Sequence, residues 1–172
     1  LDDLLAALVL DRPASPGNLG SILRSCDAFR ADGVAVRGHA ADLYDPQTIR
    51  SSLGAVFSVP VAVDASNEEL AAWLASLRRD LGGLQVLGTS PDASLRIWEA
   101  DLGRPTVFLL GNERRGMSEW LRESADRTVS IPGAGTVDSL NLAAAATIVL
   151  YELRRQRDLA ACAGAPSSPP SS

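Results

Sequence analysis

The stretch TVFLLGNERRGMS, residues 106–118, joins a short apolar strand candidate to a loop in which four polar residues stand between two glycines. A buried strand that ends in such a loop is typical of open α/β sheets, because ligands bind there at the carboxyl ends of the strands. The rest of the chain repeats this arrangement, since short β-favouring runs alternate with segments of helical periodicity. Further strands are expected at residues 8–10, 33–36, 59–63, 85–87 and 128–131.

Four helices are expected between and after these strands. Apolar residues from Leu19 to Phe29 recur at helical spacing behind Pro16-Gly17, and Asn18 is the expected N-cap. Asp45-Pro46 predicts the start of a second helix, and Ser66 to Glu69 has the pattern of a capping box. A last helix is expected at about residues 139–157. The alternation predicts an α/β fold with a mainly parallel sheet flanked by helices.

Length and composition indicate one globular domain. The chain has 172 residues, of which 46% are hydrophobic and 22% charged, and no apolar run approaches the roughly 20 residues that span a bilayer. We expect residues 1–157 to form the domain and the residues from 158 to 172, rich in Ala, Pro and Ser, to be a disordered tail. Because the chain starts at Leu1 without Met, we also expect that an amino-terminal recognition domain is missing.

The charge balance is acidic, with a net charge of −5 and a sequence pI near 4.8. Such a balance disfavours tight nucleic-acid binding, although arginines could still form a local basic patch. Candidates for this patch are Arg24, Arg30, Arg37, Arg50, Arg114 and Arg115. The two cysteines are far apart and have no ligand spacing for a metal, so we expect a reduced, cytoplasmic protein without a metal site.

Two loops resemble phosphate-binding motifs and depart from them at one decisive residue each. Residues 111–118 have the glycine spacing of a P-loop, but Met117 stands where the phosphate-binding lysine is required. Residues 133–138 resemble a dinucleotide fingerprint, but Asp138 replaces its third glycine. These departures argue against a nucleotide triphosphatase and against an NAD site.

What remains is a set of polar residues at loop ends, most of which have a plain structural explanation. Asn18 and Ser139 could only cap helices, and Glu113 could only pair with a neighbouring arginine. Two positions fit that explanation less well. Asn141 is expected one turn inside an Ala-rich helix, where an amide is a poor helix former, and Arg24 is expected on the flank of its helix, facing a possible cleft.

Taken in order, these residues fall into three motifs, and together they resemble one known family. The motifs are Asn18-Leu19-Gly20 with Arg24, then Leu110-Gly111-Asn112-Glu113 with Gly116, then Ile131-Pro132 with Ser139-Leu140-Asn141. From about residue 8 to residue 157 the chain is similar to the SpoU (TrmH-like) branch of the SPOUT methyltransferases. Three ordered motifs are a much more specific signal than one glycine loop.

The resemblance implies a SPOUT-type α/β fold with a carboxyl-terminal trefoil knot, a homodimer, and S-adenosylmethionine as the cofactor. The catalytic residues it implies are Asn18, Arg24, Glu113, Ser139 and Asn141. The cofactor-binding residues it implies are Gly88, Thr89, Ser90, Leu110, Gly111, Asn112, Gly116, Ile131, Pro132, Leu140 and Asn141. No metal and no membrane is implied.

The family reaction is methylation of a ribose 2′-hydroxyl in RNA, with rRNA slightly favoured over tRNA here. Arg24 is expected to hold a phosphate or to stabilise the developing alkoxide, because a guanidinium stays protonated and is a poor base. Asn18 and Glu113 would orient Arg24 or the ribose, and Ser139 and Asn141 would shape the cofactor pocket. Two alternatives stay open: the same fold acting on a small-molecule acceptor in secondary metabolism, or a non-catalytic RNA-binding module.

Overall fold

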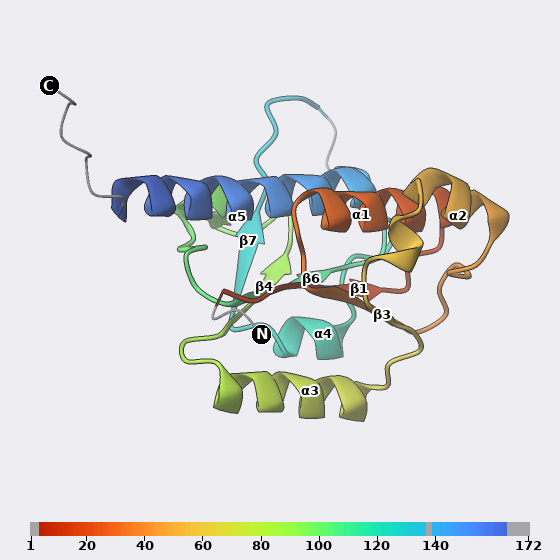
Figure 1. Ribbon diagram of the computed structural model, residues 1–172, viewed down its shortest axis with the longest axis horizontal. Helices are drawn as coiled ribbons and strands as arrows, with labels where there is room; N and C mark the ends of the chain where they lie inside the picture. Colours follow the sequence, from red (N-terminus) through yellow and green to blue (C-terminus); the bar gives the residue numbers. More distant parts are fainter. Residues whose placement is uncertain (1–3, 137–138, 165–172) are drawn as a thin grey trace, which may run out of the picture.

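The structure, a computed structural model, describes residues 4–136 and 139–164. Its centre is a parallel sheet in the order β3-β2-β1-β6-β4-β7-β5, with helices on both faces (Figure 1). The strands are β1 (Ala6–Asp11), β2 (Gly33–Arg37), β3 (Val61–Ala62), β4 (Gln85–Thr89), β5 (Leu95–Arg96), β6 (Thr106–Leu110) and β7 (Arg127–Ser130). The helices are α1 (Pro16–Ala28), α2 (Pro46–Ser52), α3 (Asn67–Asp80), α4 (Glu119–Glu123) and α5 (Leu142–Gly164), with short 3-10 turns η1 (Ala55–Phe57) and η2 (Ile97–Glu99). The predicted α/β class is confirmed.

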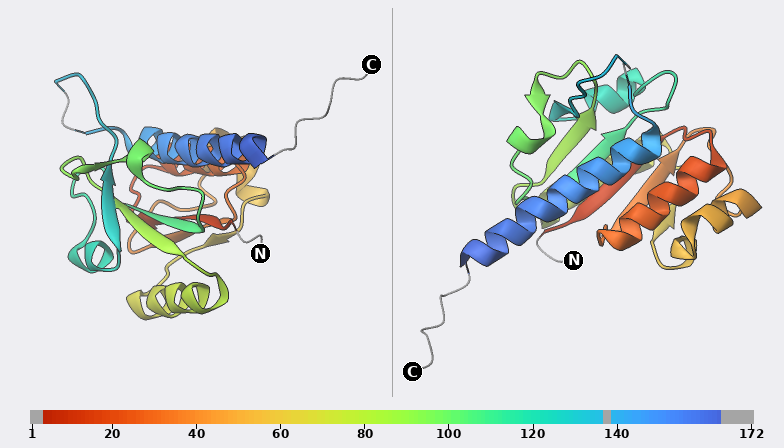
Figure 2. Two further views of the ribbon diagram at one scale, coloured as in Figure 1. Left: turned by 90° about the vertical axis from the view of Figure 1, so that its left-hand side faces the viewer. Right: turned by 90° about the horizontal axis from the view of Figure 1, so that it is seen from above.

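The helices divide into two layers. Helices α1, α2 and α5 cover one face of the sheet, and α3 and α4 cover the other (Figures 1 and 2). Strand β1 supplies both cores, because Leu8 and Leu10 pack toward α1 and α5 whereas Ala7 and Val9 pack toward α3 and α4. Burial on both faces explains why the central strands are continuous apolar runs rather than alternating ones.

The N-cap of helix α1 lies three residues before the predicted one. Ser15 is the N-cap, its hydroxyl accepts a hydrogen bond from the Asn18 backbone N–H at 3.3 Å, and Pro16 occupies the first turn. The prediction that Asn18 caps this helix is therefore wrong, and the Asn18 side chain is available for other contacts. The helix start predicted at Asp45-Pro46 and the capping box predicted at Ser66 to Glu69 are confirmed, with Asp45 and Ser66 as the N-caps.

Helix α5 differs from its predicted limits at both ends. It starts at Leu142, and Asn141 rather than Ser139 caps it, because Asn141 Oδ1 accepts from the backbone N–H groups of Ala143 and Ala144 at 2.9 and 3.3 Å. The helix continues to Gly164, so residues 158–164 are helical rather than part of a tail. Residues 165–172 lie outside the described part. No helix within residues 4–136 and 139–164 is long and apolar enough to cross a membrane.

The chain crosses over strand β7 between β4 and β5. Thr89 in β4 and Leu95 in β5 are both register partners of Val129, one on each side of β7. The connection at residues 90–94 therefore passes from one side of β7 to the other. The Ser90 backbone N–H donates to the Val129 carbonyl at 3.0 Å and fixes the start of this crossing.

Candidate active site

Three segments that are far apart in the sequence meet through one chain of side-chain hydrogen bonds. Asn18 Nδ2 donates to Glu113 Oε1 at 2.9 Å, and Asn141 Nδ2 donates to Asn18 Oδ1 at 3.1 Å. Asn18 lies in the first turn of α1, Glu113 in the loop after β6, and Asn141 at the N-cap of α5. We call Asn18, Glu113 and Asn141 the polar cluster.

The direction of each hydrogen bond in the polar cluster follows from the chemistry of its groups. An ionised carboxylate only accepts, so the amide nitrogen of Asn18 faces Glu113 and its oxygen is left for Asn141. The oxygen of Asn141 is already used as the cap of α5. The cluster thus connects the start of a helix to an acidic side chain through two amides, each of which uses both its nitrogen and its oxygen, and this fixes how both amides are turned.

Arg24 and Ser139 are not part of this cluster. Both side chains are exposed, and neither has a hydrogen bond to any residue that the structure describes. Helix α1 carries Arg24 six residues after Asn18, so the guanidinium lies further along the same helix with its charge unpaired among the described residues. Of the five predicted catalytic residues, the structure joins three and leaves these two open to solvent.

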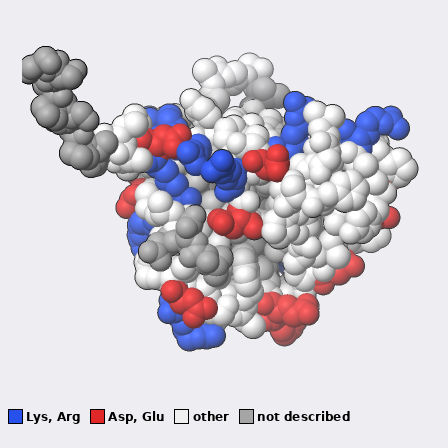
Figure 3. Space-filling view, in the orientation of Figure 1, with Lys and Arg blue, Asp and Glu red and all other residues white. Residues whose placement is uncertain are grey.

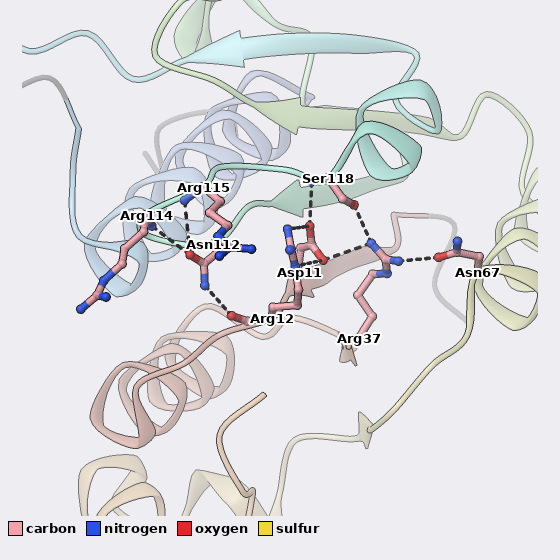
Figure 4. Close-up of polar contacts among 8 residues, drawn as sticks. All are labelled: Asp11, Arg12, Arg37, Asn67, Asn112, Arg114, Arg115 and Ser118. Carbon is pink, nitrogen blue, oxygen red and sulfur yellow. Dashed lines mark hydrogen bonds and ion pairs between the residues drawn. The ribbon is translucent and has the colours of Figure 1, made fainter. Parts of the chain in front are cut away.

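The loop after β6 is closed by Asn112 and Gly116. Their backbone groups exchange two hydrogen bonds of 2.9 Å, and Gly116 has a φ of 66°, a left-handed conformation that glycine adopts without strain. Asn112 Oδ1 accepts from the backbone N–H groups of Arg114 and Arg115, and its Nδ2 donates to the Arg12 carbonyl at 2.7 Å (Figure 4). The side chain of Asn112 therefore shapes the loop.

Close packing at the base of this loop explains Gly111 and Met117. A Cβ at Gly111 would lie 2.1 Å from backbone atoms of Gly116 and Met117, so only glycine fits. Met117, which stands where a P-loop has its lysine, is buried against Gly88 of β4. Met117, whose presence in place of a lysine excludes a P-loop, therefore serves to pack the loop against β4.

The cofactor-binding residues that the sequence predicts come from adjacent strand ends. Strands β6, β4 and β7 are neighbours in the sheet and run parallel, so their carboxyl ends lie at one edge. Leu110 is buried, Ile131 is half-buried, and Pro132 is exposed. Leu140, just before α5, is also exposed, at 46%. Of the other predicted residues, Gly88 and Thr89 end β4 and Ser90 follows it.

These residues suit a nucleoside-type group. The predicted set offers backbone N–H and C=O groups at strand ends together with apolar side chains, which is the usual lining for an adenosine. The residues therefore fit S-adenosylmethionine. Within the described residues, no group of three His, Cys, Asp or Glu side chains could hold a metal ion.

A second polar network, which the sequence analysis missed, lies beneath the loop. Asp11 at the end of β1 is fully buried, and its carboxylate accepts from Arg37 Nη1 at 3.0 Å and from the Ser118 backbone N–H at 2.8 Å. Arg37 is only 13% exposed, so it does not belong to the surface patch in which it was a candidate. Asp11 and Arg37 each end an otherwise apolar strand, and this pattern was the only sign in the sequence that they have a special role.

The fold and these strand-end loops define an α/β protein of the SPOUT class. The model of the SpoU rRNA Methylase family matches residues 6–151, and the chain belongs to this family. A 23S rRNA (uridine(2479)-2′-O)-methyltransferase from Streptomyces viridochromogenes is 46% identical over 156 residues, which cover 91% of this chain and 54% of that protein. The chain thus spans about half the length of this curated relative.

Solved structures agree with this assignment. The SpoU methyltransferase AviRb from Streptomyces viridochromogenes, in complex with the cofactor AdoMet, superposes with a TM-score of 0.88 at 43% identity, over 92% of this chain and 63% of that one. The TrmH/SpoU tRNA modifying enzyme of A. aeolicus has a TM-score of 0.78 at 28% identity, over 96% of this chain and 81% of that one. The predicted family is confirmed.

Proposed function

We propose that this chain is the catalytic part of an S-adenosylmethionine-dependent RNA ribose 2′-O-methyltransferase. The main support for this proposal is the polar cluster, in which Asn18, Glu113 and Asn141 are joined by hydrogen bonds of 2.9 and 3.1 Å. Each of the three comes from a different family motif. A cluster that merely capped helices would not need the Asn18 amide to bridge the Glu113 carboxylate and the start of a distant helix.

The cofactor would lie on the loops that follow β4, β6 and β7, against Leu140. When bound, S-adenosylmethionine supplies a methyl group on a positively charged sulfur. The chain's own residues would hold and orient it: the backbone at Gly88 to Ser90 and at Gly111, and the apolar side chains of Ile131 and Leu140. Asn141 and Ser139 would shape the pocket where α5 begins.

Arg24 would act on the ribose oxygen through its charge. A guanidinium remains protonated at physiological pH, so Arg24 is suited to hold a phosphate and to stabilise a developing alkoxide rather than to remove a proton. The exposed, unpaired position of Arg24 among the described residues supports this role, since nothing there neutralises its charge. Glu113, held by Asn18, would orient the ribose beside it.

We further propose rRNA, rather than tRNA, as the substrate. The 46% identical relative is named as a 23S rRNA 2′-O-methyltransferase. Arg24, Arg50, Arg114 and Arg115 are exposed, and Figure 3 shows basic side chains at the upper right, where α1 and α2 lie, as well as along α5. A local basic patch gives phosphate contacts even though the whole chain is acidic. We propose the cytoplasm, where ribosomes are assembled, as the location.

A homodimer and a trefoil knot complete the proposal. Three large apolar side chains within residues 44–57, a range that includes α2 and η1, are exposed, namely Tyr44 at 65%, Leu53 at 70% and Phe57 at 75%. Exposed apolar patches of this kind mark interaction sites, which supports a dimer.

The knot is supported by residues 90–94, which cross over β7. This crossing forms a loop through which the chain that follows β7 would pass.

The test is transfer of labelled methyl from S-adenosylmethionine to unmodified rRNA and tRNA transcripts, followed by alkaline digestion. A 2′-O-methyl group blocks alkaline cleavage, so the proposal expects label in alkali-resistant dinucleotides from 23S rRNA. Arg24→Ala should abolish transfer and leave cofactor affinity within about threefold, while Arg79→Ala, on the far face of the sheet, should be active. Cofactor binding without RNA labelling, also with the full-length protein, would favour a small-molecule acceptor, and failure to bind the cofactor would favour a non-catalytic module.

A further inference from the structure

The loop that carries Glu113 is attached at both ends to two consecutive residues at the end of β1. At its start, Asn112 Nδ2 donates to the Arg12 carbonyl at 2.7 Å. At its end, the Ser118 backbone N–H donates to Asp11 Oδ2 at 2.8 Å. Figure 4 shows the two attachments on either side of the Asp11 and Arg12 side chains.

The second attachment is a buried ionic network rather than a single hydrogen bond. The Asp11 carboxylate also accepts from Arg37 Nη1 at 3.0 Å and from Arg12 Nη2 at 3.1 Å. Arg37 in turn donates to Ser118 Oγ at 2.7 Å, and its guanidinium lies over the Trp120 ring of α4, 5.1 Å from the centroid. Every partner of Asp11 therefore also contacts, or belongs to, the segments that frame the loop.

Buried charges of this kind are poorly explained by stability alone. Removing two charges from water costs about as much as their attraction returns, and an apolar pair of similar size is often as stable. Arg12 has a φ of 54°, a left-handed conformation that is unfavourable for a residue with a Cβ.

We infer that Asp11, Arg12 and Arg37 are positioning residues, which hold the loop so that Glu113 meets Asn18 and the cofactor faces the strand ends. The inference rests on the proposed function for its catalytic consequence. Asp11 is fully buried and cannot touch a substrate, so it acts only through the loop. Misplacement of reacting groups by about 1 Å can cost about a hundredfold in rate, which is the scale of effect expected here.

The test compares two aspartates that lie at opposite ends of β1, Asp11 at its end and Asp32 against its start. Asp11→Asn keeps the shape of the side chain but replaces one accepting oxygen with a donor, and it leaves Arg37 without its buried counter-charge. Asp32→Asn is the matched control, because Asp32 Oδ2 accepts from the Ala6 backbone N–H at 2.7 Å at the opposite end of β1. Three quantities are measured for each: amide hydrogen exchange at Asn112, Gly116 and Ser118, the rate constant kcat for methyl transfer, and the KM for RNA.

For Asp11→Asn we expect loop exchange faster by about tenfold or more and kcat lower by about 30- to 100-fold, with the KM for RNA within about twofold. The control should stay within about twofold of wild type in all three quantities. Equal loop exchange and equal kcat in a folded Asp11→Asn protein and the control would overturn the inference. So would a loss of kcat that both variants share in proportion to their thermal stability.

Two further measurements keep the test decisive. If Asp11→Asn does not fold, Ser118→Ala removes only the hydrogen bond from Arg37, and it should still speed loop exchange and lower kcat by at least about threefold; wild-type values for both would overturn the inference. If the wild-type protein neither binds S-adenosylmethionine nor transfers methyl, the proposed function fails. The exchange rates of the loop then still decide whether Asp11 holds it.

Discussion

Asn141 Nδ2 donates a hydrogen bond to Asn18 Oδ1 across 3.1 Å, although 123 residues separate the two in the sequence. The contact joins the N-cap of α5 to the first turn of α1, two helices that lie side by side on one face of the sheet (Figure 2). Because Asn18 also donates a hydrogen bond to Glu113, a substitution at either asparagine should change the position of Glu113 in the loop after β6. The following predictions test this arrangement and the packing around it.

Asn141→Ala should lower both stability and methyl transfer, because it removes the cap of α5 and the donor to Asn18. Loss of an N-cap costs about 1 kcal/mol. Asn141→Asp separates the two effects, since an aspartate still caps the helix but cannot donate to Asn18. We expect near-native thermal unfolding for Asn141→Asp with transfer reduced at least about tenfold. Full activity of this variant would show that the link to Asn18 is not needed.

Gly111→Ala should destabilise the fold by about 2–3 kcal/mol, because the added methyl group would overlap the backbone of Gly116 and Met117. Gly82→Ala is the matched control, since its Cβ would meet nothing within 4 Å, and it should change stability by less than about 0.5 kcal/mol. Urea unfolding followed by circular dichroism measures both. Equal stabilities of the two variants would contradict the packing described at the base of the loop.

The two cysteines should differ strongly in reactivity. Burial raises the pKa of the Cys26 thiol to about 12, so its reactive thiolate is scarce at neutral pH, whereas Cys162 is exposed on α5. In the native protein a maleimide reagent should modify one thiol per chain, and in denaturant it should modify two, as counted by mass spectrometry. Native Cys162→Ser should remain unmodified. Rapid modification of Cys26 in that variant would mean that its surroundings open readily.

Stability should fall in acid partly through Glu152. Hydrogen bonds from Arg155 hold the pKa of the Glu152 carboxyl below its ordinary value of 4.5. A lowered pKa in the folded state means that the carboxylate stabilises the protein fully above the ordinary value, and that this contribution is lost as the pH falls through the folded value. Glu152→Gln should therefore flatten the decline in unfolding free energy between about pH 5 and pH 3. An unchanged slope would contradict this account.

The sheet and the three residues of the polar cluster could be predicted from the sequence. The contacts between these residues could not. Pro16 is favoured at the first position of a helix, so Ser15 rather than Asn18 was the better cap, and that preference decides where the Asn18 amide points. Alanines are strong helix formers, which explains why α5 continues past Arg157. Strand β5 has two residues and helix α4 five, too few for a periodic pattern.

Asp11 shows why part of the site could not be predicted. In the sequence it is only a polar residue that ends an apolar run. Its partners Arg37 and Ser118 come from β2 and from the segment before α4, 26 and 107 residues away. Only the parallel order of β2, β1 and β6 brings them together, and that order results from the packing of the whole sheet.

The most direct test of the proposed function is methyl transfer from labelled S-adenosylmethionine to an unmodified 23S rRNA transcript, with wild-type protein and Asn18→Ala compared at equal cofactor occupancy. We expect label in an alkali-resistant dinucleotide with the wild type, and at least about tenfold less label with Asn18→Ala. Equal labelling by the two proteins would contradict the role of the polar cluster. Cofactor binding with no labelled ribose would contradict RNA 2′-O-methylation itself.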